Sequence, residues 1–162
     1  HLLTTAYLHK GPSSVRYPRG IGSNVKVDNN LEPLEIGKAK LITDQNSNAV
    51  ILNFGSLIEE AKKVAHKLKL TLIDMRFVKP LDEKILVKYL SKAELFISIE
   101  DGSIMGGAGS AVQEFCSDKK IDIKSILFGI PDKFIDHASR NEMLDEAGLS
   151  SDKIKSKLKK LL

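Results

Sequence analysis

Residues 100–109 carry the side chains in this sequence that are best suited to chemistry. They read EDGSIMGGAG, with two carboxylates and four glycines. The turn follows an apolar run at 95–99 and precedes an amphipathic segment, which predicts a strand, a turn and a helix. Open α/β sheets bind ligands at the carboxyl ends of their strands, and N–H groups at a helix start can face an anion. The turn is therefore the first candidate site.

Two explanations compete for the glycines of this turn. A dinucleotide-binding loop needs the pattern G-x-G-x-x-G, but Val112 stands where its third glycine belongs. Alternatively, the glycines allow the backbone to approach another chain or domain closely. Glu100 and Asp101 are adjacent, so in a strand they would point to opposite faces and make a poor acid/base pair. We expect capping or hydrogen bonding across an interface from them rather than catalysis.

Arg16 and Arg19 form a second candidate, in the segment VRYPRG. A guanidinium group binds phosphate through two parallel hydrogen bonds, and a rigid proline turn at a strand end would hold it in place. The alternative for Arg16 is a surface or interdomain ion pair, which the residues alone favour. Asp74 and Arg76 lie two apart at a predicted strand end and share a face, so a structural ion pair is expected.

His137 is the third candidate, in the loop after the last predicted strand. It could contact a partner's active site, but a lone histidine beside an aspartate is more often simply hydrogen-bonded. Cys116, the only cysteine, lies on the apolar face of a predicted helix and is expected to be a buried thiol. The sequence shows no Cys/His metal spacing, no P-loop and no Ser–His–Asp order, so it predicts no metal site and no complete active site.

Composition fits a globular protein. The 162 residues suffice for one domain with a sizeable core, and no apolar run reaches the roughly 20 residues that span a bilayer. The net charge is +4, and the densest basic run, 153–160, lies along an amphipathic helix. We interpret this run as the solvated outer face of the helix. The alternative, binding to nucleic acid or a membrane, is weakly supported, and neither partner is expected. The chain starts at His1, and we expect it to be a fragment of a longer protein.

Strands and helices alternate along the chain, which predicts the frame that positions these candidates. We expect a three-layer α/β/α domain with a five-stranded, mostly parallel sheet and one antiparallel strand. The link at 44–48 is too short for a parallel crossover, so the first two strands are antiparallel if they pair. Ser56 and Glu59 predict a capping box, and Asp82 predicts a second helix cap. The sheet strands are expected at 39–43, 49–54, 70–74, 95–99 and 123–128, with a separate short strand at 14–17. Helices are expected at 2–9, from 56 to 68, from 82 to 90, at 110–117, at 141–147 and from Ser150 or Ser151.

Five sequence blocks occur together in one order, and their combination is specific. Together they closely resemble the C-terminal part of the 1-deoxy-D-xylulose-5-phosphate synthase family, thiamine-diphosphate enzymes of the transketolase superfamily. A generic transketolase, or the β subunit of pyruvate dehydrogenase, shares the domain type but not these runs. The blocks are VRYPRG at 15–20, ILNFG at 51–55, DMRFVKPLDE at 74–83, GGAGSAVQE at 106–114 and GIPDKFIDH at 129–137.

The resemblance implies a parent enzyme that condenses pyruvate with D-glyceraldehyde 3-phosphate, loses carbon dioxide and yields 1-deoxy-D-xylulose 5-phosphate. This transferase step opens the methylerythritol phosphate route to isoprenoids and also feeds thiamine biosynthesis. The resemblance implies a homodimer whose preceding domains bind thiamine diphosphate and Mg²⁺, so no cofactor is expected in this chain, which alone should be inactive. It implies a cytoplasmic enzyme in a bacterium, or a plastid or apicoplast enzyme in a eukaryote. The alternative is a non-catalytic dimerisation or interdomain scaffold module of another enzyme of the superfamily.

Residue by residue, Arg16 matches the arginine that holds the phosphate of glyceraldehyde 3-phosphate, which now favours phosphate binding over an ion pair. Arg19 matches the same motif without a role. The turn and His137 match positions that we expect to pack against the preceding domain and the dimer mate, so Arg19, Glu100, Asp101 and His137 are assigned to an interface or the active-site periphery. The implied domains are the tail of the pyrimidine-binding domain (1–20), a linker (21–36) and a transketolase C-terminal domain (37–162).

Overall fold

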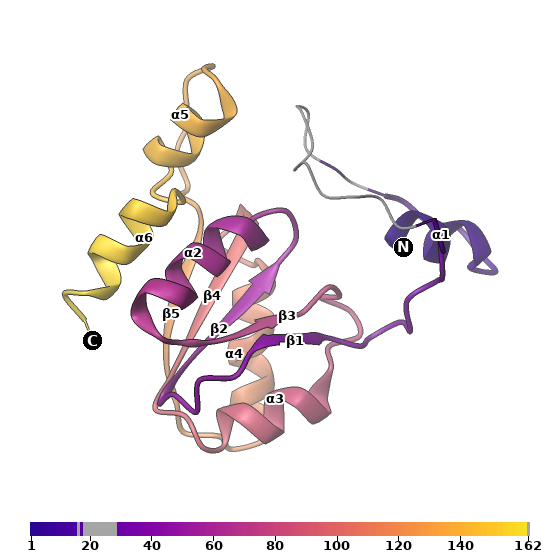
Figure 1. Cartoon of the computed structure of the whole chain (residues 1–162), viewed down its shortest axis with the longest axis horizontal. Helices are drawn as coiled ribbons and strands as arrows, with labels where there is room; N and C mark the ends of the chain where they lie inside the picture. Colours follow the sequence, from indigo (N-terminus) through magenta and orange to yellow (C-terminus); the bar gives the residue numbers. More distant parts are fainter. Residues whose placement is uncertain (16, 18–28, 162) are drawn as a thin grey trace.

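A single five-stranded sheet forms the centre of the computed structural model, which describes residues 1–15, 17 and 29–161 (Figure 1). The strand order is β1-β3-β2-β4-β5, with four parallel strands and β1 antiparallel to β3, as the sequence predicted. The strands are β1 (Lys40–Thr43), β2 (Ala49–Phe54), β3 (Thr71–Asp74), β4 (Leu95–Ser103) and β5 (Lys124–Ile130). The helices are α1 (Leu2–Leu8), α2 (Ile58–Leu68), α3 (Glu83–Leu90), α4 (Ala108–Asp118), α5 (Arg140–Glu146) and α6 (Ser151–Leu158).

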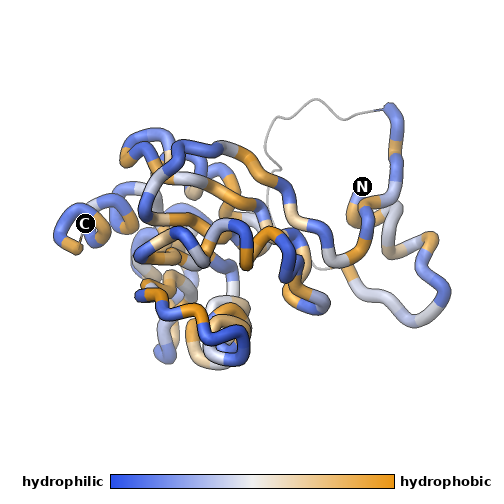
Figure 2. The backbone as a smooth tube through the Cα atoms, turned by 90° about the horizontal axis from the view of Figure 1, so that it is seen from below, coloured by the Kyte–Doolittle hydropathy of each residue, from blue (hydrophilic) through white to orange (hydrophobic). Residues whose placement is uncertain are grey.

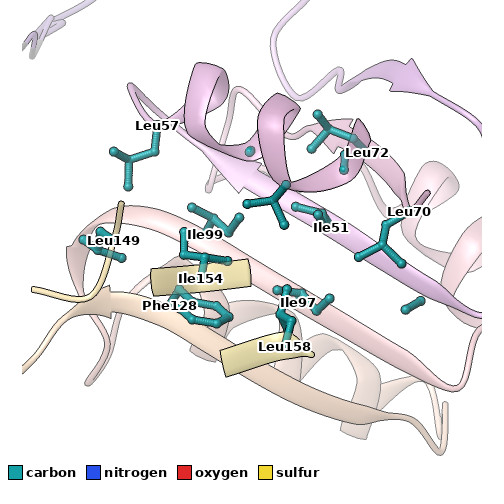
Figure 3. Close-up of a cluster of buried hydrophobic side chains, with 14 residues drawn as sticks. Ile51, Leu57, Leu70, Leu72, Ile97, Ile99, Phe128, Leu149, Ile154 and Leu158 are labelled. Carbon is teal, nitrogen blue, oxygen red and sulfur yellow. The ribbon is translucent and has the colours of Figure 1, made fainter. Parts of the chain in front are cut away.

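Helices cover both faces of the sheet, which gives the expected three layers. Along β2, side chains alternate between the faces, and every residue of this strand is buried. Ile51 packs with α2 and α6, in a cluster that Figure 3 shows between these helices and the sheet. Leu52 packs with α3 and α4 on the other face, where Cys116 is buried as predicted and burial raises the pKa of its thiol. The central strands are therefore buried between two apolar clusters, one on each face of the sheet.

The connections after the central strands create a topological switch point at the carboxyl ends of β2 and β4. Helix α2 follows β2 and covers one face, whereas α4 follows β4, the neighbouring strand, and covers the other face. Strands β2 and β4 stay paired as far as Phe54 and Glu100, so it is the connections after them, not the strands, that separate toward the two faces of the sheet. Open α/β sheets bind ligands at such switch points.

Strand β1 has the predicted direction but does not pair with β2. Strand β3 lies between the two, so residues 44–48 cross the end of β3 instead of forming a hairpin. The backbone N–H of Gln45 donates to Thr71 Oγ1 at 3.1 Å as the loop crosses. Five residues can reach about 17 Å when extended, which exceeds the roughly 10 Å across two strand spacings. The short link therefore excludes a parallel crossover without requiring a hairpin.

The predicted capping box at the start of α2 is wrong. Leu57 is the N-cap residue and provides no side-chain cap, while the Ser56 hydroxyl donates to the carboxylate of Asp101 instead. A tertiary partner thus replaces the local one, and Glu59 forms a surface ion pair with Lys62. The predicted cap of α3 is confirmed, since Asp82 Oδ1 accepts from the backbone N–H of Ile85 at 3.2 Å.

Strand β4 extends beyond its predicted end. It continues to Ser103 because Ser103 pairs with Ile130 of β5, so Glu100 and Asp101 lie within a strand rather than in the turn. The predicted short strand at 14–17 is wrong for its described residues, since Ser14, Val15 and Tyr17 adopt no strand.

The N-terminal segment, residues 1–15, lies beside the α/β body (Figure 2). Hydrogen bonds join it to residues 32–34, which precede β1. Helix α1 forms as predicted, and Thr5 Oγ1 accepts from the backbone N–H of Leu34 at 2.7 Å. Residues 18–28, which include the first half of the predicted linker, are outside the described residues. Within the described ranges, no helix has the length and apolar character needed to cross a membrane. The outer side of α1 exposes four large apolar residues, Leu2, Leu3, Tyr7 and Leu8.

Candidate functional site

The glycine turn is closed by a carboxylate of the protein itself. Glu100 is 5% exposed, and its Oε2 accepts from the N–H of Ala108 at 2.8 Å. Its Oε1 accepts from the N–H of Gly109 at 3.0 Å. These donors belong to the first turn of α4, whose N-cap residue Gly107 has no side chain to cap it. The anion expected at this helix start is thus Glu100, which confirms its predicted capping and argues against a nucleotide cradle.

Two glycines of the turn are required by packing inside the domain. A Cβ atom at Gly107 would collide with the carbonyl of Ser103 and the carboxylate of Glu100. A Cβ atom at Gly109 would collide with Ser98 Oγ and a methyl group of Leu127. The close backbone approach that the sequence predicted therefore occurs between β4, β5 and α4. An approach to another chain or domain stays a prediction.

Asp101 points to the opposite face of the sheet, as predicted, and belongs to a polar network. The Ser56 hydroxyl donates to Asp101 Oδ2 at 2.5 Å. Arg140 Nη2 donates to Ser56 Oγ at 2.9 Å and lies 3.5 Å from Asp101 Oδ2. Sequence reasoning missed Ser56 and Arg140 as site residues, because partners separated by 45 and 39 positions from Asp101 leave no local pattern.

A groove of about 970 Å³ opens above this network. It lies at the carboxyl ends of β2, β4 and β5, on the side of the switch point that α5 covers. Polar groups of Ser56, Asp101 and Arg140 form one part of the lining. Apolar side chains from α5 and the segment after it form another part, including Met143, Leu144 and Leu149. The volume is in the range of small-molecule pockets, so this groove is the strongest candidate binding site on the described chain.

His137 lies at the groove, on the exposed loop between β5 and α5. Its ring makes no hydrogen bond to any described residue, so the predicted bond to a neighbouring aspartate is wrong for that part of the chain. Phe134, from the same loop, is fully exposed. The assignment of His137 to an interface or the active-site periphery stays a prediction.

The predicted pair of Asp74 and Arg76 forms at the end of β3, with Arg76 Nε 3.9 Å from Asp74 Oδ2. Burial raises the pKa of Asp74, and the guanidinium of Arg76 opposes that shift. The neighbouring Asn53 is fully buried, and its Oδ1 has no partner among the described residues. Arg16, the predicted phosphate-binding residue, and Arg19, assigned to an interface or the active-site periphery, lie outside the described residues.

The cofactor of the resembling family can be tested against the groups in this chain. The described residues contain no group of three or more His, Cys, Asp or Glu that could hold a metal ion. The N–H groups at the start of α4 are already bonded to Glu100. The glycine turn and the described metal-ligating side chains therefore do not fit Mg²⁺ with the diphosphate of thiamine diphosphate, and no chemical step is assigned to that cofactor here.

Comparison with known sequences connects these features to a family. The family model described as "Transketolase, C-terminal domain" matches residues 37–154. The chain is 45% identical over 150 residues to 1-deoxy-D-xylulose-5-phosphate synthase of Pseudomonas aeruginosa strain LESB58, covering 93% of this chain and 24% of that protein. It is 46% identical over 162 residues to the synthase of Pseudomonas syringae pv. tomato strain DC3000, covering 99% and 25%. The chain thus spans about a quarter of the length of these relatives.

Solved structures share the fold. A split-gene transketolase, described as an inactive β4 tetramer, superimposes with a TM-score of 0.72 at 24% identity, covering 80% of this chain and 43% of that chain. The transketolase of Campylobacter jejuni gives a TM-score of 0.52 at 16% identity, covering 75% and 18%. At such identities the likeness concerns the fold alone.

Proposed function

This chain belongs to the transketolase C-terminal domain family, and from that premise we propose that it is the C-terminal part of a 1-deoxy-D-xylulose-5-phosphate synthase. The observation that carries the proposal is the 45–46% identity to such synthases along 93–99% of the chain. Identity to the split-gene transketolase is 24%. The longer protein would be a transferase that joins pyruvate to D-glyceraldehyde 3-phosphate, releases carbon dioxide and forms 1-deoxy-D-xylulose 5-phosphate for isoprenoid and thiamine biosynthesis.

In this proposal the chain supports a catalytic centre that other domains build. Thiamine diphosphate with Mg²⁺ would supply the carbanion chemistry and be held by residues outside this chain, and two copies would form a homodimer. Residues 1–20 would belong to the preceding domain, 21–36 to a linker and 37–162 to the domain described above. The exposed apolar side of α1 supports this division, since such a surface normally packs against protein. We place the enzyme in the cytoplasm if its source is bacterial, like the relatives compared above.

Arg16 is the residue of this chain that we propose to contact substrate, through the phosphate of glyceraldehyde 3-phosphate. The first test is turnover of pyruvate and glyceraldehyde 3-phosphate by the full-length protein loaded with thiamine diphosphate and Mg²⁺. The second test compares kcat/KM of wild type and Arg16→Ala with phosphorylated and unphosphorylated glyceraldehyde. Loss of a charged phosphate contact should lower kcat/KM by about 30-fold to several hundredfold for the phosphorylated substrate only.

Lys10→Ala is a matched control, because Lys10 is a cation in the same segment. It should leave both values of kcat/KM unchanged. An Arg16→Ala variant that loses activity equally on both substrates, or on neither, would show that Arg16 is structural. Absence of turnover by the wild-type protein would reject the synthase itself.

A scaffold module of another transketolase-superfamily enzyme is the second candidate, and exposed apolar side chains favour it. Phe134 and Met105 stand on neighbouring loops and are 102% and 72% exposed. Such residues are typical anchors in protein interfaces. If the full-length protein dimerises but shows no synthase activity, and Phe134→Ser weakens the dimer in sedimentation experiments, the scaffold explanation replaces the synthase.

A further inference from the structure

The groove at the switch point has features of a small-molecule site that the proposed synthase reaction does not use. It lies where the connections after β2 and β4 leave toward opposite faces of the sheet, and its wall includes the backbone turn at Gly55. Gly55 has a φ of 83°, and a Cβ atom there would meet nothing within 4 Å. This glycine is therefore required by its backbone conformation and borders open space. A ligand in the groove could approach the end of β2 closely.

Arg140 is oriented by the domain but only partly used by it. Only its Nη2 has partners within the described part of the chain, namely Ser56 and Asp101. The Nε and Nη1 donors have none there, and the side chain is 37% exposed. Because Asp101 and Ser56 hold one side of the guanidinium, the group is pre-organised to donate on its remaining side. Guanidinium donors held in this way bind carboxylate or phosphate oxygens well.

The described side chains that line the groove carry one more positive than negative charge, which favours an anionic ligand. Asp101 is the one carboxylate among the described lining residues, against the two cations Arg140 and Lys133. Lys133 is half-exposed and lies 3.5 Å from Glu146, a surface pair that holds it weakly. His137 adds a ring with no partner among the described residues.

The apolar side chains in the lining indicate that the ligand has an apolar body in addition to its anionic group. The apolar lining includes Met143 and Leu144 on α5, beside Arg140, Ile130 at the end of β5, and the buried Phe54 and Leu149. A free inorganic anion would leave this surface without a partner, whereas an aromatic or aliphatic body would cover it. We propose that the groove binds a small organic anion, with its carboxylate or phosphate on Arg140 and its apolar body against α5. This inference does not depend on the synthase reaction.

The test measures binding of three probes to the purified full-length protein by isothermal titration calorimetry. The probes are 2-naphthoate, 2-naphthyl phosphate and the neutral 2-naphthalenemethanol. Arg140→Gln should weaken binding of the anionic probes by about 10-fold or more, because a charge-assisted hydrogen bond is lost. It should change binding of the neutral probe by less than about twofold. The anionic probe that binds more tightly to wild type identifies the preferred group.

Two further variants keep the test decisive if Arg140→Gln perturbs the fold. Ala138→Trp, which adds a large side chain to the groove lining, should weaken all three probes. Lys159→Gln, which removes an exposed cation beyond the groove, should change none of them. The proposal is overturned if no anionic probe binds the wild type, or if Arg140→Gln binds both anions as tightly as wild type. It is also overturned if Ala138→Trp, with an unchanged Tm, leaves binding intact.

Discussion

The glycine turn and the groove lie on opposite faces of the same strand end, and they treat neighbouring carboxylates differently. Glu100 is buried beneath α4 and accepts two backbone N–H bonds there. Asp101, the next residue, shares a half-exposed network with Ser56 and Arg140 at the groove. The carboxylate of Glu100 caps a helix inside the domain. The carboxylate of Asp101 instead orients the guanidinium of Arg140, whose Nε and Nη1 have no partner among the described residues.

This difference shows that a chemically rich sequence segment need not be the site. The turn has the residues of an anion site, but its own strand provides the anion, and neighbouring atoms occupy the space where side chains at Gly107 and Gly109 would lie. The groove has no sequence motif, yet it lies where the connections after β2 and β4 separate, and its polar groups converge from the turn after β2, from β4 and from α5.

Removing the two carboxylates in turn should separate their roles. Glu100→Ala would leave the buried N–H groups of Ala108 and Gly109 without an acceptor, which should lower the free energy of unfolding by about 3 kcal/mol. Asp101→Ala should lower it by about 1 kcal/mol or less, because its partners are half-exposed. Urea denaturation of both variants measures the difference. Equal losses would contradict the contrast between a structural cap and a surface network.

Two adjacent glycines offer a sharper test of the turn. Gly107→Ala should cost about 2–3 kcal/mol, since its Cβ would overlap Glu100 and the carbonyl of Ser103. Gly106→Ala should cost about 1 kcal/mol, because position 106 has open space but a φ of 69°. Thermal unfolding measures both variants. The loss at Gly107 should come from steric overlap, and the loss at Gly106 from backbone conformation. If Gly106→Ala were the more damaging, the packing argument for Gly107 would be wrong.

The glutamate that caps α5 differs from Glu100 at α4 in being exposed, and its contribution to stability should depend on pH. Helix α5, beside the groove, has an exposed capping box in which the hydroxyl and N–H of Ser139 donate to Glu142. These bonds lower the pKa of the Glu142 carboxyl. A lowered pKa in the folded state means stabilisation above the unfolded-state pKa, which is lost as the pH falls through the folded-state value.

Glu142→Gln should therefore lower Tm slightly at pH 7 and leave it unchanged relative to wild type well below about pH 4. Thermal unfolding of both proteins across this range tests the prediction. Glu114→Gln, which changes an exposed glutamate with no bonded partner in the described chain, should show no such dependence. A Glu142→Gln effect that persisted at pH 3 would mean that shape, not charge, makes the contribution.

Local signals predicted the elements well and the partners poorly. The apolar run of β2 and the Asp82 cap of α3 were confirmed because the residues that decide them are close in sequence. The Ser56–Glu59 box met the same local criterion and was wrong, since Asp101 competed for Ser56 from another strand. The end of β4 was placed too early for a similar reason, as pairing with β5 extends the strand to Ser103. The Arg16 and Arg19 predictions lie outside the described residues and stay predictions.

Contiguous residues were enough to predict the α/β alternation, the antiparallel direction of the first strand and the opposite facing of Glu100 and Asp101. Each follows from hydrophobic period, link length or the geometry of one strand, which are properties of contiguous residues. Packing between distant segments placed β3 between β1 and β2 and put the carboxylate of Glu100 at the start of α4. It also brought Ser56, Asp101 and Arg140 together at the groove. The reason is physical: strand order, burial and hydrogen bonds between distant residues depend on which surfaces pack together, and no short stretch of the chain contains both partners.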